Sequence, residues 1–277
     1  MAEAPLTRKQ TLRNATVFIG GGRITSALIG GLRLAKYGSP ILVDDHNPAK
    51  LKVLRREFNV GVTLDLKSAV EQAEILIIAV RPDSVRRLLA DIQRSGASSW
   101  PSVIISLAAG IPLRNLKRMA PHLHWARAMP SPACRTRHGL TALTFDASLP
   151  LTIRKQVRTL FGQVGSVLEI PEDRLDPFTV TYSASHGYHA LATLTRAAMK
   201  AGLDEQTALL AASHALADAI VSWREGSSSL QELLHEAATP GGIAAATIQA
   251  MNKAGYERAV RRGLRAGLAK ASSNAKA

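Results

Sequence analysis

Cysteine is nearly absent from this sequence of 277 residues, and aromatic residues make up only 4% of it. The single cysteine, Cys134, has no second cysteine for an internal disulfide, which is typical of proteins from a reducing compartment. Long apolar runs are missing as well: stretches such as residues 75–80 suit buried strands and are far shorter than the roughly 18 to 20 residues of a membrane-spanning helix. Residues 1–14 are basic but include no apolar segment of signal-peptide length. These absences predict a soluble, cytoplasmic protein with no membrane partner.

Acidic residues are too few to balance the basic ones, since 35 Lys and Arg face 21 Asp and Glu for a net charge of +14. Clustered positive charge would indicate a nucleic-acid partner, because it releases counterions from phosphate. Here the basic residues are scattered, except in residues 253–276. No aromatic residues for base stacking are interleaved there. We therefore predict a solvated helix face and no nucleic-acid partner, with the charge helping to attract an anionic cofactor and substrate.

The first half of the sequence alternates short apolar runs with amphipathic stretches. This rhythm predicts an α/β fold whose parallel strands are joined by right-handed crossovers. The predicted strands are residues 15–19, 41–43, 75–80, 103–107 and 140–144, and the clearest helices between them are residues 24–37 and 48–58.

Beyond about Glu169 the pattern changes to long helices rich in alanine and leucine. Gly202 is the expected C-cap of one helix, and Asp204 is the expected N-cap of the next. The surplus of apolar helix surface favours an oligomer, because a partner would bury it. We predict a Rossmann-type dinucleotide-binding domain at residues 1–170 and an all-α dimerisation and substrate domain at residues 171–277. The predicted helices of the second domain are residues 176–201, 204–223, 229–237 and 242–269.

A glycine-rich turn follows the first predicted strand. Gly20 permits the tight bend, and Gly22 lets the backbone approach a pyrophosphate. Arg23 and Ile24 then begin a helix whose N-terminus offers free N–H groups and the positive end of its dipole. Thr25 stands where Gly or Ala is usual, so we expect the helix and the strand to sit slightly further apart. The place of the turn after the first strand predicts dinucleotide binding.

Two carboxylates, Asp44 and Asp45, end the second predicted strand. A carboxylate at this place accepts hydrogen bonds from the adenosine ribose and repels a 2′-phosphate, which favours NADH over NADPH. His46 and Lys50 could offset the repulsion of a 2′-phosphate and so oppose this preference. Both NAD and NADP therefore remain candidate cofactors. The alternative is that Asp44 is a plain turn residue.

Further short motifs follow in a fixed order, and together they resemble the motifs of the pyrroline-5-carboxylate reductase family. The resemblance runs from about residue 16 to residue 268. Each motif alone is common, but their order and spacing are specific. The motifs are Gly20-x-Gly22 with Ala27, Leu28, Gly31 and Leu32; Val80-Arg81-Pro82; Ser106-x-Ala108-Ala109-Gly110-Ile111; Arg127-Ala128-Met129-Pro130; residues 139–143; and Pro240-Gly241-Gly242.

The resemblance implies an NAD(P)H-dependent oxidoreductase that reduces a C=N bond in a small cyclic imino acid, by default pyrroline-5-carboxylate to proline. It also implies a helical dimerisation domain, often within a larger ring of dimers, and catalysis where the two domains meet. Together with the end of the second strand described above, the resemblance gives the predicted cofactor residues Gly20, Gly22, Arg23, Ile24, Asp44, Asp45, His46, Val80, Arg81, Pro82, Ala108, Ala109, Gly110, Met129, Pro130 and Ser131.

The sequence departs from the family at both segments that the resemblance assigns to the substrate. Members of the family open the first long C-terminal helix with Ser-Gly-Ser-Gly-Pro-Ala-Tyr, and a later helix starts with Pro-Gly-Gly-Thr-Thr. Backbone N–H groups at such helix starts suit a substrate carboxylate. Here the hydroxyl usually placed near the imine nitrogen is lost at Ala244, and Ser131 replaces an amide beside the nicotinamide. The substrate residues are predicted to be Ser183, Ala184, Ser185, Gly187, Thr239, Gly241, Gly242, Ile243 and Ala244.

Two hypotheses follow from these departures. In the first, the protein reduces a different imine of a specialised pathway, and His186, Tyr182 or Tyr188 supplies the proton. Histidine titrates near neutrality, and tyrosine can donate without ionising. In the second, the protein is a catalytically inactive relative that binds a nucleotide. The surviving cofactor motifs favour catalysis, although His186 could equally cap or pack a helix.

Other candidate sites have simpler explanations. A zinc site would need converging imidazoles with a fourth ligand, and His186, His189 and His214 lack such spacing, so we predict no metal. A lone buried cysteine such as Cys134 is more often inert packing than chemistry. Arg127 is predicted to be structural.

Overall fold

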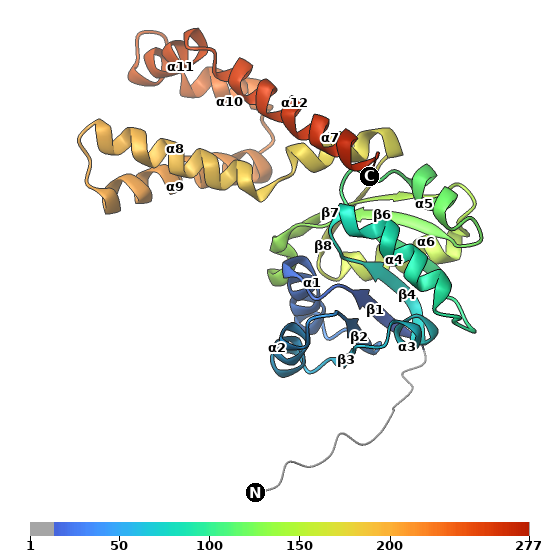
Figure 1. Cartoon of the computed structure of the whole chain (residues 1–277). Coiled ribbons are helices and arrows are strands. Elements are labelled where there is room, and N and C mark those ends of the chain that lie inside the picture. The colour runs from blue at the N-terminus through green and yellow to red at the C-terminus, as the bar shows by residue number, and fades with distance from the viewer. Residues whose placement is uncertain (1–13, 277) are drawn as a thin grey trace, which may run out of the picture. The chain divides into compact units, whose positions relative to one another are not determined.

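The computed structural model describes residues 14–276, and Figure 1 shows the order of their elements. The expectation that the N-terminus lacks a signal peptide falls almost wholly on residues 1–13, outside the described residues. The chain divides into two compact units. Unit 1 comprises the described residues of Met1–Val180 and Leu268–Ala277, and unit 2 is Thr181–Gly267. The domain boundary after residue 170 stays a prediction.

Unit 1 is built on one eight-stranded sheet in the order β3-β2-β1-β4-β5-β6-β7-β8. The pair of β6 and β7 is antiparallel, and all other neighbouring pairs are parallel. This confirms the predicted α/β fold. The strands are β1 Ala15–Ile19, β2 Ile41–Asp44, β3 Gly61–Thr63, β4 Ala73–Ile78, β5 Val103–Ser106, β6 Trp125–Met129, β7 Gly139–Phe145 and β8 Gly165–Glu169.

Helices cover both faces of this sheet and bury its apolar side chains, as parallel sheets require. One face packs against α1 (Arg23–Leu34), α2 (Pro48–Phe58) and α6 (Leu151–Gly162). The other face packs against α3 (Leu66–Gln72), α4 (Pro82–Arg94) and α5 (Leu113–Met119). The sheet core therefore lies between two helical layers, which leaves the ends of the strands accessible for a site.

A buried arginine joins the sheet to the helix that follows its last strand. Arg127 of β6 is 1% exposed, and its guanidinium pairs with Glu172 at 2.7 Å and Asp176 at 3.1 Å. Both carboxylates belong to α7 (Glu172–Thr181). Glu172 also accepts the Leu113 backbone N–H at the start of α5. Removing one partner of such a buried pair leaves an uncompensated charge, so Arg127 fixes α7 and α5 against β6.

Unit 2 is all helical, and two of the long predicted helices are in fact broken. Residues 176–201 form α7 and α8 (Ala184–Lys200), because the backbone leaves the helix at Tyr182 and Ser183. Residues 242–269 form α11 (Ile243–Lys253) and α12 (Tyr256–Asn274), separated by Gly255 with φ +85°. The last residues of α12 belong to unit 1. The other two helices are α9 (Glu205–Glu225) and α10 (Leu230–Ala237).

The predicted helix ends between α8 and α9 are largely right. The Asp204 side chain accepts the Thr207 N–H at 3.0 Å, which confirms Asp204 as the N-cap of α9. Ala201 is the C-cap of α8, and Gly202 follows it with φ +112°, a conformation that glycine adopts without strain. Gly202, the predicted C-cap, thus stands one position after the observed C-cap.

Within unit 2 the helices bury little of their apolar surface. None of the residues of α8, α10 and α11 is buried. No helix among residues 14–276 is long and apolar enough to cross a membrane. The exposed large apolar side chains of this unit include Leu194, Met199, Leu203, Leu209, Leu210, Ile220, Val221, Trp223, Leu230, Leu234, Ile243, Met251, Tyr256 and Val260.

Helix α1 packs so closely on the segment after β6 that one of its glycines has no room for a side chain. A Cβ at Gly31 would overlap the carbonyl oxygen of Cys134 and lie 2.9 Å from Val164. A Cβ at the neighbouring Gly30 would lie 3.3 Å from Arg135 Cγ, a flexible side chain that can shift. Two adjacent glycines of one helix therefore differ in what they tolerate.

We expect Gly31→Ala to lower the free energy of unfolding by about 2–3 kcal/mol, because the backbone of residue 134 must move. Gly30→Ala should be neutral or stabilising by up to about 1 kcal/mol, since alanine favours the helix. Urea denaturation of both variants measures the difference. Equal effects of the two substitutions would show that the close approach at Gly31 is wrong.

Candidate functional site

The residues predicted to bind the cofactor lie at one edge of the sheet. The glycine turn follows β1, Asp44 ends β2 with Asp45 next to it, and the three later motifs follow β4, β5 and β6. These five strands are neighbours in the order β2-β1-β4-β5-β6 and run parallel. Their carboxyl ends therefore meet at the same edge. The chain leaves β1 toward β2 on one side, whereas β4 lies on the other, and ligands bind at such a switch point.

The glycine turn has the backbone geometry of an anion site. Gly20 has φ +106°, and an added Cβ would lie 2.8 Å from the Ala79 carbonyl oxygen, so only glycine fits. Gly22 is the N-cap of α1 and offers no capping side chain. The first intrahelical bond runs from Ser26 N–H to the Gly22 oxygen. The N–H groups at the start of α1, those of Arg23 and Ile24, therefore have no intrahelical acceptor and are available to an anion, with the helix dipole behind them.

Thr25 takes part in this turn through its hydroxyl. The side chain is fully buried and donates a hydrogen bond of 2.5 Å to the Gly20 carbonyl oxygen. That bond satisfies both buried polar groups, which would otherwise destabilise the fold. Thr25, which is larger than the Gly or Ala usual at this position, is thus hydrogen-bonded to the glycine turn.

Asp45 holds the glycine turn from the neighbouring strand. Its carboxylate accepts the Gly21 N–H at 2.7 Å and the Asn47 N–H at 2.8 Å. Lys50 and His46 each lie 3.6 Å from it. Burial opposes ionisation, but these hydrogen bonds outweigh burial and lower the pKa of Asp45. Both carboxylate oxygens are engaged within the protein.

Asp44 is in the opposite situation. It is 9% exposed, and burial, followed by the charges of Asp45 and Asp65, raises its pKa to about 6. At neutral pH this carboxylate is ionised at a cost in free energy, which a hydrogen-bond donor would reduce. Of the two predicted acidic residues, Asp44 is therefore the one suited to accept hydrogen bonds from a ligand.

The three later motifs form turns at the same edge. Arg81 is the N-cap of α4, and Pro82 is its first residue. The Ala108 N–H donates to Ser106 Oγ at 3.3 Å. Gly110 has φ +80°, and an added Cβ there would overlap the carbonyl oxygen of Ala271 of α12. Ser131 is buried and stands at the N-cap position of the short helix Pro132–Thr136 after β6, without a side-chain cap bond.

The predicted catalytic residues belong to the start of α8. Ser183 is the N-cap of this helix with no side-chain cap bond, and its hydroxyl lies 2.7 Å from that of Ser185. His186 donates its backbone N–H to the Ser183 carbonyl oxygen at 2.9 Å. Its side chain is exposed, and Tyr188 is 71% exposed. Tyr182 precedes the helix, so all three candidate proton donors stand around one helix start.

The second predicted substrate segment opens α11. Gly241 has φ +81°, and Gly242 is the N-cap without a capping side chain. The Gly242 N–H donates to the Thr239 carbonyl oxygen at 2.9 Å, which closes a tight turn. Ile243 and Ala244 then form the first helical turn, whose backbone N–H groups lack intrahelical acceptors.

The remaining histidines show simpler contacts. His214 lies 3.2 Å from Asp218 on the exposed side of α9. Among residues 14–276, no group of three or more His, Cys, Asp or Glu side chains is arranged to hold a metal ion. Cys134 is buried against Thr141, and burial raises the pKa of its thiol, which disfavours the reactive thiolate.

Two family models match the chain, one in each half. Residues 16–110 match "NADP oxidoreductase coenzyme F420-dependent". Residues 172–274 match "Pyrroline-5-carboxylate reductase dimerisation". The first match contains the glycine turn and the motifs after β4 and β5, and the second contains both segments predicted to bind the substrate.

Relatives of known name agree with these models. The pyrroline-5-carboxylate reductase of Mycobacterium leprae is 30% identical over 206 residues, which cover 72% of this chain and 70% of that protein. The enzyme of the same name from Synechocystis is 27% identical, over 90% of this chain and 93% of its own. The structure of Plasmodium falciparum pyrroline carboxylate reductase with NADP bound shares the fold, with a TM-score of 0.83 at 19% identity and coverage of 95% and 98%. This chain belongs to the pyrroline-5-carboxylate reductase family.

Proposed function

We propose that the protein is an NAD(P)H-dependent reductase that converts pyrroline-5-carboxylate to proline. Family membership supports this proposal, and the observation that carries it is the glycine turn at the switch point of the sheet. There Gly20 fits against Ala79, and Gly22 leaves the N-terminus of α1 uncapped. These features suit a dinucleotide diphosphate.

Different residues of unit 1 are assigned to different parts of the cofactor. Gly22, Arg23 and Ile24 hold the diphosphate with backbone N–H groups, and Asp44 accepts hydrogen bonds from the adenosine ribose. When bound, the cofactor supplies the hydride for the C=N bond. The remaining positions along it are Gly20, Asp45, His46, Val80, Arg81, Pro82, Ala108, Ala109, Gly110, Met129, Pro130 and Ser131.

NADH is the preferred cofactor in this proposal. The Plasmodium falciparum relative has NADP bound, but in this chain a 2′-phosphate would meet Asp44 beside Asp45. Lys50 is already engaged by Asp45 at 3.6 Å, so it offsets little of that repulsion. Turnover with NADPH is expected to be weaker.

The substrate carboxylate is assigned to the helix starts of unit 2, where the backbone N–H groups do not depend on the side chain. Ser183, Ala184, Ser185 and Gly187 contribute from α8, and Thr239, Gly241, Gly242, Ile243 and Ala244 from α11. The proton for the imine nitrogen comes from His186, Tyr182 or Tyr188, since Ala244 carries no hydroxyl. Reduction of a different cyclic imine is the second candidate, favoured by this loss at Ala244.

The proposed protein is also a homodimer. The helices of unit 2 expose a series of large apolar side chains, among them Leu210, Ile220 and Trp223, and the matching family model is a dimerisation domain. A second copy would bury this surface. Assembly of dimers into a larger ring, a division into domains after residue 170, and a cytoplasmic location suited to the single cysteine belong to the same proposal.

The activity is tested by following NADH and NADPH absorbance with pyrroline-5-carboxylate and a panel of other cyclic imines. We expect turnover with pyrroline-5-carboxylate and a kcat/KM at least tenfold higher with NADH than with NADPH. Turnover with another cyclic imine, but not with pyrroline-5-carboxylate, would identify that imine as the substrate. Tight NADH binding without turnover on any imine would identify an inactive nucleotide-binding relative.

We expect the Asp44 carboxylate to lower the stability of the fold at neutral pH and to bind the cofactor. Because its pKa is raised to about 6, its protonated form stabilises the fold below about pH 4, and this contribution is lost as pH rises through about 6. Asp44→Asn should therefore be more stable than the parent protein by about 1–2 kcal/mol at pH 7.5 and equal to it near pH 4. The same variant should bind NADH about tenfold more weakly, through the loss of a charge-assisted bond.

Denaturation at the two pH values and NADH fluorescence titration measure these effects. Asp91→Asn, an exposed carboxylate on α4, is the control and should change neither. An Asp44→Asn protein that is less stable at pH 7.5, or that keeps its NADH affinity, would remove Asp44 from this role.

His186 is the first candidate for the proton donor. His186→Ala is expected to lower kcat about a hundredfold, because general acid catalysis contributes on that scale, and to leave the Kd for NADH within twofold. His189→Ala on the next turn of α8 is the matched control with near-normal kcat. Unchanged turnover of His186→Ala would transfer the role to Tyr182 or Tyr188.

A further inference from the structure

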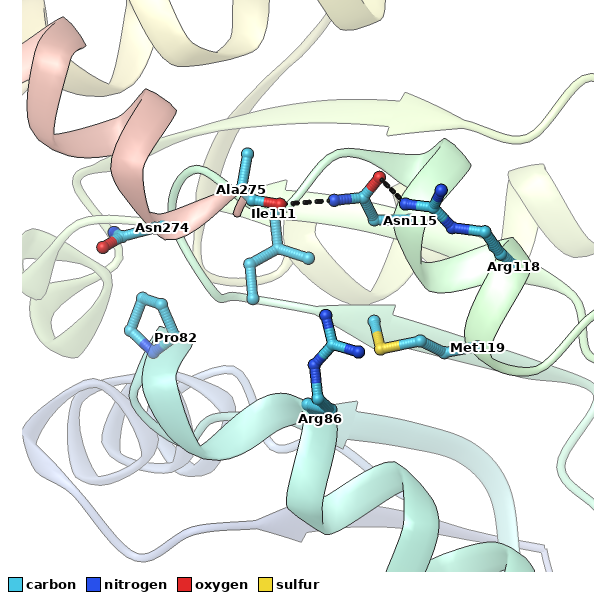
Figure 2. Close-up of a pocket in the computed structure, with 8 residues that line it drawn as sticks. All are labelled: Pro82, Arg86, Ile111, Asn115, Arg118, Met119, Asn274 and Ala275. Carbon is cyan, nitrogen blue, oxygen red and sulfur yellow. Dashed lines mark hydrogen bonds between the residues drawn. The ribbon is translucent and has the colours of Figure 1, made fainter. Parts of the chain in front are cut away.

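A cavity of about 430 Å³ lies in unit 1 between α4, α5 and the C-terminal end of α12. Figure 2 shows the Arg86 side chain rising from α4 toward Ile111 and Met119. Arg118 and Asn115 reach the same cavity from α5. Its volume is within the range of pockets that hold small metabolites.

The charged side chains among the described residues that line this cavity are all positive. Arg86 and Arg118 line it, and among the described residues that line it no side chain is a carboxylate. Arg118 forms no ion pair within residues 14–276. Two guanidinium groups on separate helices attract an anion and can each bind a phosphate or carboxylate through two N–H groups.

Hydrogen bonds hold the walls of the cavity in place. Asn115 donates its side-chain amide to the Ala275 carbonyl oxygen at 2.7 Å and accepts from Arg118 Nη2 at 3.0 Å. Asn274 donates to the Ala109 carbonyl oxygen at 3.2 Å. These bonds fix the end of α12 across the cavity and orient the Arg118 guanidinium. The arrangement is therefore preorganised, which lowers the entropic cost of binding.

A wider groove continues from this cavity and adds further basic residues. Arg114 and Lys276 line it together with Arg86 and Arg118. Three acidic side chains of the described residues line the groove: Glu172 and Asp176, which pair with Arg127 of the same groove, and Asp173, which does not line the smaller cavity. The net charge around the shared part of the two cavities is thus positive.

We propose that this cavity is a binding site for a small, multiply charged anion that carries phosphate or carboxylate groups. Arg86 of α4 and Arg118 of α5 bind the anion, and Asn115 holds the Arg118 guanidinium in position. Pro82 is the one lining residue that is also predicted along the cofactor, so the site stands apart from the glycine turn and from Asp44. Binding here requires no turnover, and it does not depend on the proposed reductase activity.

Calorimetric titration of the full chain with pyrophosphate and with citrate, at constant ionic strength, tests the site. Titrations with and without saturating NADH separate this cavity from a diphosphate site at the glycine turn. We expect one equivalent of probe to bind in both conditions. Arg118→Gln and Arg86→Gln should each weaken binding at least tenfold, whereas Arg118→Lys, which keeps the charge but loses the two-pronged contact, should have an intermediate affinity.

Arg87→Gln is the matched control, because it removes an equal charge from α4 at a side chain that lies 3.8 Å from Asp91 and outside the cavity. It should bind the probes like the parent protein. Three results would overturn the proposal: no binding of either probe at millimolar concentration, loss of binding when NADH is present, or equal weakening by Arg87→Gln and Arg118→Gln.

Discussion

The hydrogen bond from Gly21 N–H to Asp45 is the contact on which the candidate site depends. It ties the turn after β1 to the end of β2, across two neighbouring parallel strands. With one carboxylate so engaged, the glycine turn keeps its shape without a ligand, and the N-terminus of α1 stays uncapped. The neighbouring carboxylate, Asp44, remains buried and costly to ionise. The preorganised glycine turn and the unfavourable ionisation of Asp44 therefore have a common origin in two adjacent aspartates.

A second constraint acts at the other end of the parallel edge. Arg127 is buried in β6, so its charge must be matched, and the matching carboxylates come from α7 and not from the sheet. Glu172 extends this link to the Leu113 N–H at the start of α5. The strand that leads to Met129, Pro130 and Ser131 is thereby fixed in place. A hydrophobic residue at this position would pack without partners but would leave two acidic side chains unpaired.

The fold was predictable from the sequence wherever apolar periodicity was clear. β1 and α2 have the predicted bounds, because continuous apolar runs and the Pro at the start of α2 mark them. β6 was missed since Arg127 interrupts its apolar run, and the short β3 offered too few residues for a pattern. The helix breaks at Ser183 and Gly255 were hidden by flanking helix formers. The order of motifs predicted the cofactor edge, but the sequence could not reveal that Asp45 would bind Gly21, because that contact depends on strand pairing.

The departures from the family motif change side chains at the two substrate segments but not their backbone. Gly241 with φ +81° and Gly242 as N-cap keep the turn before α11, and Ser183 keeps an extended N-cap before α8. Since N–H groups at a helix start can bind a carboxylate whatever the side chains, the proposed carboxylate contacts do not depend on these changes. What is lost is a hydroxyl at Ala244, and what is gained is an imidazole at His186. The sequence has therefore kept the backbone of both predicted substrate segments while changing their side chains, which supports the proposed change of proton donor over loss of catalysis.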